Sequence, residues 1–272
     1  MRRPAALALL APGNDPLVAV DLDGSGQLSL FVANDARPNF LFVNRTTTRG
    51  QSPRFDERAL RAGVALNRLG QTEACMGVAA GDSDGDGRID LFVTNFEFES
   101  NTLYRQVSDG VFADATQDAG LSVGGLPLLG FGTQFLDADL DGRLDLFVTN
   151  GHTEKDPGPD AAYEMSPQFY RNRGRGAFRE LESDALGEYF PRKYLGRGVA
   201  RLDVNRDGLP DLAVTHLDAP LALLENESPV GGRHFLVVHL RGTLSGRDAI
   251  GSRVEVQSGD LRLVRQLTAG DG

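Results

Sequence analysis

The sequence predicts an all-β protein assembled from repeated units, and three observations support this prediction. Aspartate-rich loops recur along the chain, short apolar runs typical of strands flank each loop, and glycine and proline are scattered between these runs. The chain has 272 residues, including 33 glycines and 13 prolines, so it is long enough for several such units to bury a substantial core.

The most complete acidic loop spans 82–90 and reads Asp-Ser-Asp-Gly-Asp-Gly-Arg-Ile-Asp. Acidic residues occupy loop positions 1, 3, 5 and 9, and Gly87 at position 6 permits a tight turn because glycine tolerates a positive φ. Carboxylates gathered on one side of a loop repel one another, and a hard cation with many oxygen ligands relieves that repulsion. The loop therefore predicts a calcium site, in which Arg88 offers its backbone carbonyl and Asp90 closes the cage.

The EF-hand is the first alternative, because it shares the acidic start and the glycine at position 6. It also requires a bidentate glutamate at position 12 and a helix on either side of the loop. Position 12 is Val93, which lies in the run 89–94, and the β-branched and aromatic residues of that run are typical of a strand. The sequence therefore predicts a calcium loop that connects strands.

The pattern recurs at 137–145 and 203–211, and a weaker copy at 21–29 has Ser25 and Ser29 at positions 5 and 9. We expect the weaker loop to bind calcium weakly or not at all. The ligands predicted for the three full loops are Asp82, Asp84, Asp86, Arg88 and Asp90; Asp137, Asp139, Asp141, Arg143 and Asp145; and Asp203, Asn205, Asp207, Leu209 and Asp211, where position 7 contributes its carbonyl.

The repeat extends beyond the loops, which begin 61, 55 and 66 residues apart. A glycine stands five residues before three of them, and apolar runs for a second and a third strand follow each loop. A fourth strand is expected around Phe55, Phe112 and Phe178. Four short strands in roughly 60 residues are typical of a propeller blade. We therefore predict four visible β-propeller blades over 15–229, as part of a larger ring.

A partial small β domain is predicted for 230–272, with strands at 233–240, 253–256 and 261–265. The third blade carries an insertion rich in proline, glycine and acidic residues at 151–160, which is expected to be a surface loop. The lone Cys75 falls on the strand before a calcium loop and is expected to be a buried small hydrophobe.

Residues 1–14 combine a positive start with a short apolar segment, as in a signal peptide, but show no clear cleavage site. Either a leader or a frayed segment fits them. No apolar run approaches the roughly 20 residues of a membrane helix, so no membrane span is predicted.

The formal net charge of −10 argues against a nucleic-acid partner. The chain has no G-x-S-x-G or H-E-x-x-H motif, and its four histidines show no metal-ligand spacing. His216 takes the place that asparagine occupies in two other repeats, which favours a role in a turn. These features predict a protein that is not an enzyme.

The loop pattern, set in a blade and followed by Leu-Phe-Val-Thr-Asn, resembles the FG-GAP/VCBS repeats of integrin-like propellers. The run 242–254, Gly-Thr-Leu-Ser-Gly-Arg-Asp-Ala-Ile-Gly-Ser-Arg-Val, resembles the ASPIC/UnbV domain, with Gly246 where that domain has asparagine. Together they resemble the bacterial family related to cartilage acidic protein. In that family the ASPIC/UnbV unit is longer and more blades stand upstream, so we expect this chain to be a piece of a longer protein.

The resemblance implies a non-enzymatic, calcium-binding module for binding or adhesion, in an extracytoplasmic or secreted protein. Its partner would be an unidentified extracellular protein or glycan. The alternative is a hydrolase or a natural-product-pathway accessory enzyme on a propeller scaffold, since propellers also host hydrolases and the UnbV label comes from natural-product gene clusters. A purely structural spacer without a ligand is a third possibility.

Overall fold

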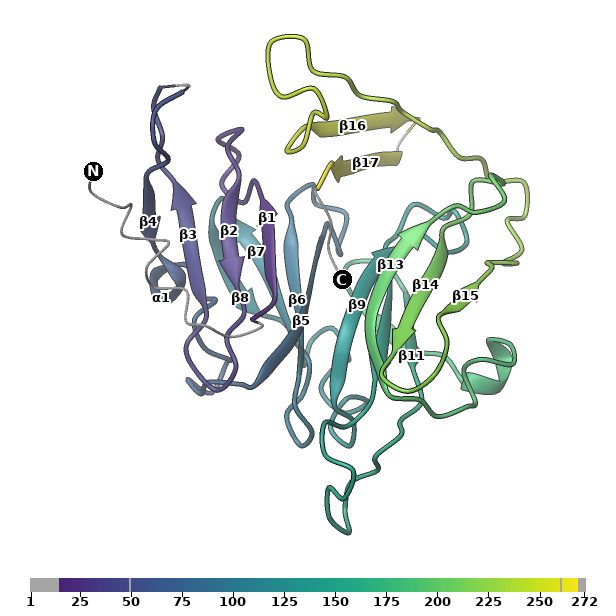
Figure 1. Ribbon diagram of the computed structural model, residues 1–272. Helices are drawn as coiled ribbons and strands as arrows, with labels where there is room; N and C mark the ends of the chain where they lie inside the picture. Colours follow the sequence, from purple (N-terminus) through teal and green to yellow (C-terminus); the bar gives the residue numbers. More distant parts are fainter. Residues whose placement is uncertain (1–14, 49, 260, 269–272) are drawn as a thin grey trace.

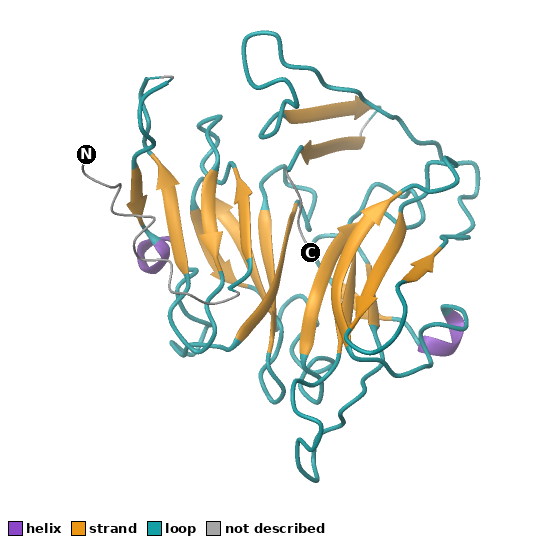
Figure 2. Ribbon diagram, viewed as in Figure 1, coloured by secondary structure: helices purple, strands orange, loops and turns teal. Residues whose placement is uncertain are grey.

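A computed structural model describes residues 15–48, 50–259 and 261–268 of the chain, and nearly all of its regular structure is β (Figures 1 and 2). Four antiparallel sheets follow one another in chain order and stand side by side as an open arc. This arrangement confirms the predicted all-β fold with propeller-like blades. The predicted leader at 1–14 lies outside the described residues.

Within each sheet, consecutive strands are neighbours. The first blade contains β1 (Leu17–Val20), β2 (Ser29–Val32), β3 (Phe40–Asn44) and β4 (Phe55–Glu57). The second contains β5 (Cys75–Gly81), β6 (Asp90–Asn95), β7 (Thr102–Ser108) and β8 (Val111–Asp114). The third contains β9 (Gly130–Leu136), β10 (Asp145–Asn150), β11 (Gln168–Asn172) and β12 (Phe178–Glu180). Each acidic loop joins the first and second strands of its blade, so strands flank it as predicted.

The fourth blade corrects the expectation of four strands in every blade. Among the described residues, it contains only β13 (Gly196–Leu202), β14 (Asp211–His216) and β15 (Ala222–Leu224). Pro229 lacks a backbone N–H, and Gly231 and Gly232 adopt φ of 57° and 84°, so the chain turns away after β15.

The strand predicted at 233–240 is also wrong, because this segment is irregular. The four apolar side chains of its centre, Phe235 to Val238, are all exposed. No strand within the described part of the chain pairs with its backbone. An apolar run alone does not make a strand when the hydrogen-bonding partner is missing.

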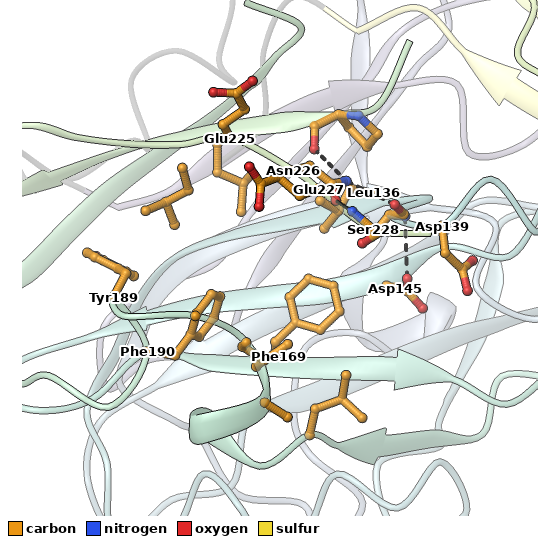
Figure 3. A pocket seen from close by; sticks show the side chains of 18 of the residues that line it. Leu136, Asp139, Asp145, Phe169, Tyr189, Phe190, Glu225, Asn226, Glu227 and Ser228 are labelled. Atoms are coloured by element: carbon orange, nitrogen blue, oxygen red, sulfur yellow. Dashed lines mark hydrogen bonds between the residues drawn. The ribbon is translucent and has the colours of Figure 1, made fainter. Parts of the chain in front are cut away.

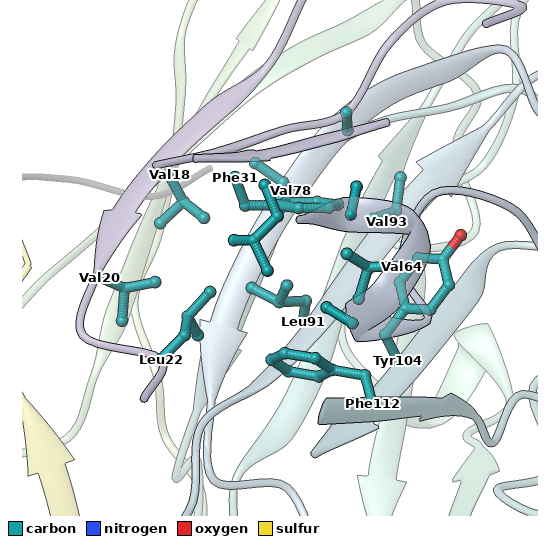
Figure 4. Close-up of a cluster of buried hydrophobic side chains, with 14 of the residues drawn as sticks. Val18, Val20, Leu22, Phe31, Val64, Val78, Leu91, Val93, Tyr104 and Phe112 are labelled. Atoms are coloured by element: carbon teal, nitrogen blue, oxygen red, sulfur yellow. The ribbon is translucent and has the colours of Figure 1, made fainter. Parts of the chain in front are cut away.

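Three hydrophobic clusters fill the spaces between neighbouring blades. Figure 4 shows the first, where Phe31 of β2 and Leu91 of β6 meet the ring of Tyr104 from β7. The short helix α1 (Ala59–Ala62) returns the chain from the first blade and adds Ala59 and Ala62 to the same cluster. A 3-10 turn, η2 (Ser183–Ala185), lies in the corresponding connection after the third blade. The core therefore lies between the blades, and each connection packs against the next sheet.

The glycine that precedes the second and the third loop allows the first strands of neighbouring blades to approach closely. A Cβ at Gly77 would collide with the carbonyl oxygen of Phe131 on β9, and one at Gly132 would lie 2.8 Å from the carbonyl oxygen of Arg197 on β13. Cys75 on β5 is buried, as the sequence predicted. The close approach of Gly77 to β9 and of Gly132 to β13 sets how neighbouring blades pack.

The C-terminal strands β16 (Arg253–Ser258) and β17 (Leu261–Gln266) form an antiparallel hairpin, close to the strands predicted there. Figure 1 shows the hairpin above the end of the blades that carries the acidic loops. The Gln266 side chain accepts a hydrogen bond from the Asp21 N–H at 2.9 Å, and Arg265 donates to the Gly142 carbonyl at 3.3 Å. Among the described residues, no helix has the length and apolar character needed to cross a membrane.

Candidate metal centre

The four acidic loops share one backbone conformation. Positions 4 and 6 have positive φ in every copy: Gly24, Gly85, Leu140 and Arg206 at position 4, and Gly26, Gly87, Gly142 and Gly208 at position 6. Leu140 and Arg206, at 56° and 63°, adopt this conformation although a side chain makes it unfavourable. Such strain persists only where surrounding interactions hold the backbone in place.

The aspartate at position 1 provides one of these interactions. Asp82 accepts hydrogen bonds from the N–H groups of Gly85 at 2.8 Å and Gly87 at 3.0 Å. Asp137 accepts in the same way from Asp141 and Gly142, both at 2.9 Å. The first carboxylate of the loop therefore closes the turn around itself.

The carboxylates at positions 1, 3 and 5 come together in two of the three full loops. In one group Asp82, Asp84 and Asp86, and in the other Asp137, Asp139 and Asp141, offer oxygen atoms that all lie within 4.8 Å of one another. Burial raises the pKa of Asp82 and of Asp137 above the usual value, because the ionised form is partly removed from water. Three carboxylates this close repel one another, and a bound cation would relieve that repulsion.

Asp139 provides a direct test of whether a cation fits. Its side chain is buried, and its Oδ1 atom has no hydrogen-bond partner within the described chain. Burying a carboxylate oxygen without a hydrogen-bond donor is unfavourable. Such an oxygen is a good ligand for a hard cation. The oxygen-only donor set and this unsatisfied atom both fit calcium.

The aspartate at position 9 has a structural role that the sequence did not predict. Asp90 accepts hydrogen bonds from the Gln106 N–H at 2.8 Å and the Ser83 N–H at 3.0 Å, and so joins the third strand to the loop. Asp145 and Asp211 accept from the equivalent groups of their own blades. Burial raises the pKa of Asp90 and of Asp145 to about 7. None of the three belongs to either three-carboxylate cluster of positions 1, 3 and 5. Their predicted role as calcium ligands stays a prediction.

At position 7, Arg88 and Arg143 use their guanidinium groups to pair with the position-5 aspartates of their own loops, Asp86 and Asp141. The backbone N–H groups of Arg88 and Arg143 donate to the same carboxylates at 2.8 and 2.9 Å. In the fourth blade the backbone N–H of Leu209 donates to Asp207 at 2.8 Å. The use of the position-7 carbonyls as ligands also stays a prediction.

Arginines from outside the loops balance the charge at position 3, and the sequence analysis missed them. Arg45 lies 3.0 Å from Asp23, and Arg105 lies 3.4 Å from Asp84. Asp139 pairs with Arg171 and, at 3.2 Å, with Arg233. A repeat alignment could have found Arg105 and Arg171, because each directly precedes the polar residue that joins the third strand to position 9.

The fourth-blade loop differs from the other two full loops. Among the described residues, its aspartates at positions 1, 5 and 9 do not come together as a cluster of three carboxylates. Asn205 at position 3 donates to Asp207 at 2.9 Å and to Glu225 at 2.8 Å, and Glu225 takes the place of Arg105 and Arg171. In the part of the chain that the structure describes, the weaker loop at 21–29 also forms no cluster of three carboxylates. Over the residues described, the carboxylates at positions 1, 3 and 5 therefore cluster in two of the three full loops.

Two histidines have structural partners instead of metal-ligand geometry. The His216 ring lies 2.9 Å from the Tyr189 hydroxyl through Nε2 and 2.8 Å from the Pro220 carbonyl through Nδ1, which agrees with a role in the β14–β15 turn. His152 is buried in the insertion of the third blade, where its Nε2 lies 3.2 Å from Glu97. Both positions lie at the end of the blades opposite the acidic loops.

Three overlapping segments, 21–93, 82–148 and 137–214, match the FG-GAP-like repeat family. Each segment begins at the start of one acidic loop and ends within the strand that directly follows the next acidic loop. The matched segments cover more than half of the chain, so the protein belongs to the FG-GAP-like repeat family. They end at residue 214, and the assignment of the tail to an ASPIC/UnbV unit stays a prediction.

Among curated proteins, the chain is similar to cartilage acidic protein 1 of Mus musculus. The two are 27% identical over 235 residues, which cover 79% of this chain and 34% of the relative. The Homo sapiens protein of the same name is 26% identical over 243 residues, covering 80% of this chain and 32% of the relative. The chain therefore spans about a third of the length of these relatives.

Two solved structures are distantly similar. One is an Agrocybe aegerita lectin that recognises non-reducing terminal N-acetylglucosamine, with a TM-score of 0.41 and 17% identity, covering 79% of this chain and 52% of the lectin. The other is the Bacillus licheniformis rhamnogalacturonan lyase PL11, with a TM-score of 0.38 and 14% identity, covering 74% of this chain and 40% of the lyase. At these scores neither structure bears on function.

Proposed function

We propose that the protein is a calcium-stabilised, non-enzymatic binding module. The observation that carries this proposal is the pair of three-carboxylate groups, Asp82–Asp84–Asp86 and Asp137–Asp139–Asp141, placed at the same turn of successive blades. Two repeats that independently assemble the same oxygen cluster indicate a shared ligand more strongly than one surface cluster would. Calcium suits them because it accepts 6–8 oxygen ligands in flexible geometry.

The two groups would hold the ion through their carboxylates, with the position-7 carbonyls and the position-9 aspartates as further candidates. We extend the proposal to the fourth-blade loop, in which Asp203, Asn205, Asp207, the Leu209 carbonyl and Asp211 would serve. The bound cation would neutralise the mutual repulsion of the carboxylates. Its role in this proposal is structural: it stabilises the loop against the neighbouring third strand.

The binding role rests on family membership and on similarity to cartilage acidic protein 1. We propose an extracytoplasmic or secreted parent protein, with an extracellular protein or glycan as partner. We propose that it is not an enzyme, since the acidic residues that cluster are engaged in the loops, and His152 and His216 have structural partners. We also propose that 15–229 form the propeller part and 230–272 a separate small β domain.

Isothermal titration with calcium and thermal melting test the metal proposal. We expect saturable binding by the stripped wild-type chain and a higher melting temperature in excess calcium. A ligand at about 100 times its dissociation constant stabilises the native state by about 2.7 kcal/mol per site. Asp84→Asn combined with Asp139→Asn should abolish the tight sites of the two groups.

Asp156→Asn is the matched control, because Asp156 is an exposed acidic residue of the insertion, outside both groups. It removes one negative charge, as each of the two substitutions in the groups does, and should leave the calcium isotherm unchanged. Equal melting temperatures in calcium and in chelator would show that the loops are ordinary acidic turns, and the proposal would then fail.

A further inference from the structure

The outermost strand has the same register in the first three blades. Its phenylalanine lies opposite a polar residue at or near the end of the third strand, giving the pairs Phe55 with Asn44, Phe112 with Gln106 and Phe178 with Asn172. Phe112 and Phe178 are buried, with 5% and 7% of their surface exposed. An acidic residue stands two positions later in each case, as Glu57, Asp114 and Glu180. The outermost strand therefore reads Phe-x-acidic in all three blades.

The connection returning from the previous blade receives this phenylalanine. Gly63, which follows the first blade, lies so close to the Phe112 carbonyl that a Cβ would collide with it, and a Cβ at Gly120 would lie 3.0 Å from the Phe178 carbonyl. The Phe178 N–H donates to the Ala119 carbonyl at 2.8 Å. Each glycine has a positive φ and stands at the same place in the repeat.

In the part of the chain that the structure describes, the fourth blade has the receiving residues but lacks the outermost strand. Asn226 corresponds to Gln106 and Asn172, because its N–H donates to the position-9 aspartate, Asp211, at 2.8 Å. The receiving glycine is Gly187, which has a φ of 91° and no atom within 4 Å of a Cβ placed on it. In the position of Tyr104 and Tyr170, β15 carries the smaller Leu224.

A cavity of about 500 Å³ occupies this place (Figure 3). Its apolar wall includes Phe169 and Phe190, and Glu225 and Asn226 line its rim. It also contains Gly187 and Leu224, the two residues that the register places beside a missing strand. The cavity therefore coincides with the volume that an outermost strand and its phenylalanine fill in the second and third blades.

The edge of β15 also presents the backbone groups that such a strand needs. In the first three blades the carbonyls of Leu41, Leu103 and Phe169 accept a hydrogen bond from the residue just after the outermost strand, at 2.8, 2.8 and 2.9 Å. Leu223 is their equivalent in β15. By the same register, its carbonyl points toward the open edge. An unpaired edge with a row of such groups is a template for a further strand.

We propose that this cavity and the β15 edge bind an extended segment of a partner polypeptide as the fourth strand of the blade. The segment pairs antiparallel with β15 and places a phenylalanine opposite Asn226, against Gly187. An acidic residue follows two positions later, as in the other blades. Between them a basic residue complements Glu225 on the facing strand, because opposite charges directly across a strand pair are favourable. The recognised pattern is Phe-basic-acidic, in the mode of strand addition.

The chain contains a suitable probe, because β12 itself reads Phe178-Arg179-Glu180. A fluorescein-labelled peptide with the sequence of 175–182 is titrated with the full chain, and its anisotropy is measured. We expect saturable binding, and at least tenfold weaker binding by the peptide with alanine in place of its phenylalanine. This comparison does not depend on the folding of any protein variant.

Gly187→Ala tests the location. An added Cβ there should meet the carbonyl of the incoming phenylalanine, so affinity should fall at least tenfold. Gly158→Ala is the matched control, because Gly158 also has a positive φ, 105°, and no atom within 4 Å of the added Cβ. It should leave the peptide affinity within twofold of wild type, and thermal melts of both variants confirm that they are folded.

The proposal is overturned if the wild-type chain does not bind the peptide, or if the alanine peptide or Gly187→Ala binds as tightly as its parent. It is also overturned if sedimentation shows a dimer that Gly187→Ala dissociates, since a second copy would then occupy the edge. If the chain binds the peptide only when it carries Phe235→Asp, the segment 233–240 occupies the cavity and the β15 edge in the wild-type chain instead. Calcium titration of the same preparation reports separately on the metal proposal.

Discussion

Replacing Asp90 by alanine separates the structural role of the acidic loops from their metal binding. Asp90 accepts hydrogen bonds from the N–H groups of Ser83 and Gln106, and both residues are at most 3% exposed. A buried donor left without an acceptor costs about 1–3 kcal/mol. Two such donors predict a loss of about 2–6 kcal/mol, against a typical stability of about 5–15 kcal/mol for a domain.

The loss should be present without calcium, because the two hydrogen bonds do not involve a metal. We would measure the free energy of unfolding by urea denaturation at neutral pH, in chelator and in excess calcium. Asp84→Ala is the comparison. The Asp84 Oδ1 atom accepts from the Asp86 N–H at 3.1 Å in an exposed part of the loop, and the loss of the Asp84 ion pair with Arg105 is offset by relief of its repulsion from Asp82 and Asp86. Asp84→Ala should change stability little in chelator and remove the calcium-dependent gain. If Asp90→Ala matches wild type in chelator, the structural role assigned to Asp90 is wrong.

Two other properties can be tested. Arg206 is exposed with a φ of 63°, so Arg206→Gly should raise the free energy of unfolding by up to about 1 kcal/mol, whereas Arg206→Ala keeps the unfavourable conformation and should give no gain in the same urea titration. In calcium-free buffer the stability should fall as pH rises from about 4 to about 7. Burial raises the folded-state pKa of Asp90 and Asp145 to about 7 from an unfolded value near 3.9, so their contribution is present below the unfolded pKa and is lost through the folded one. Melting temperatures that rise over this range would contradict that assignment, and Asp90→Asn should flatten the dependence.

The fold could be predicted well from the sequence, because each level of pattern agreed with the others. The run 89–94 is rich in β-branched and aromatic residues, the acidic loop precedes it, and the unit recurs. The prediction failed where pairing depends on a neighbour instead of on local sequence. The segment 233–240 has a strand-like composition, but no described strand lies beside it. The expectation of a four-stranded fourth blade failed for the same reason, because no described strand pairs with the outer edge of β15.

The candidate site could be predicted only in part. Loop spacing identified the carboxylates at positions 1, 3 and 5, and two groups assemble as expected. Spacing could not show that Asp90 faces backbone N–H groups, since that depends on where the third strand arrives. The pairing of Arg171 with Asp139 was also hidden, because the insertion at 151–160 lengthens the interval between loop and strand in that blade.

The conformation of the loops and their affinity for a cation are set by different positions. The weaker loop has serine at positions 5 and 9, yet Asp21 accepts from the Gly26 N–H at 2.7 Å, as Asp82 does from Gly87. Ser29 accepts from the Asn44 N–H at 3.4 Å, in the place of the Asp90 contact with Gln106. The same turn therefore forms with half of the carboxylates. Backbone hydrogen bonds to positions 1 and 9 build the loop, and acidic residues at positions 3 and 5 determine whether it gathers three carboxylates around one point.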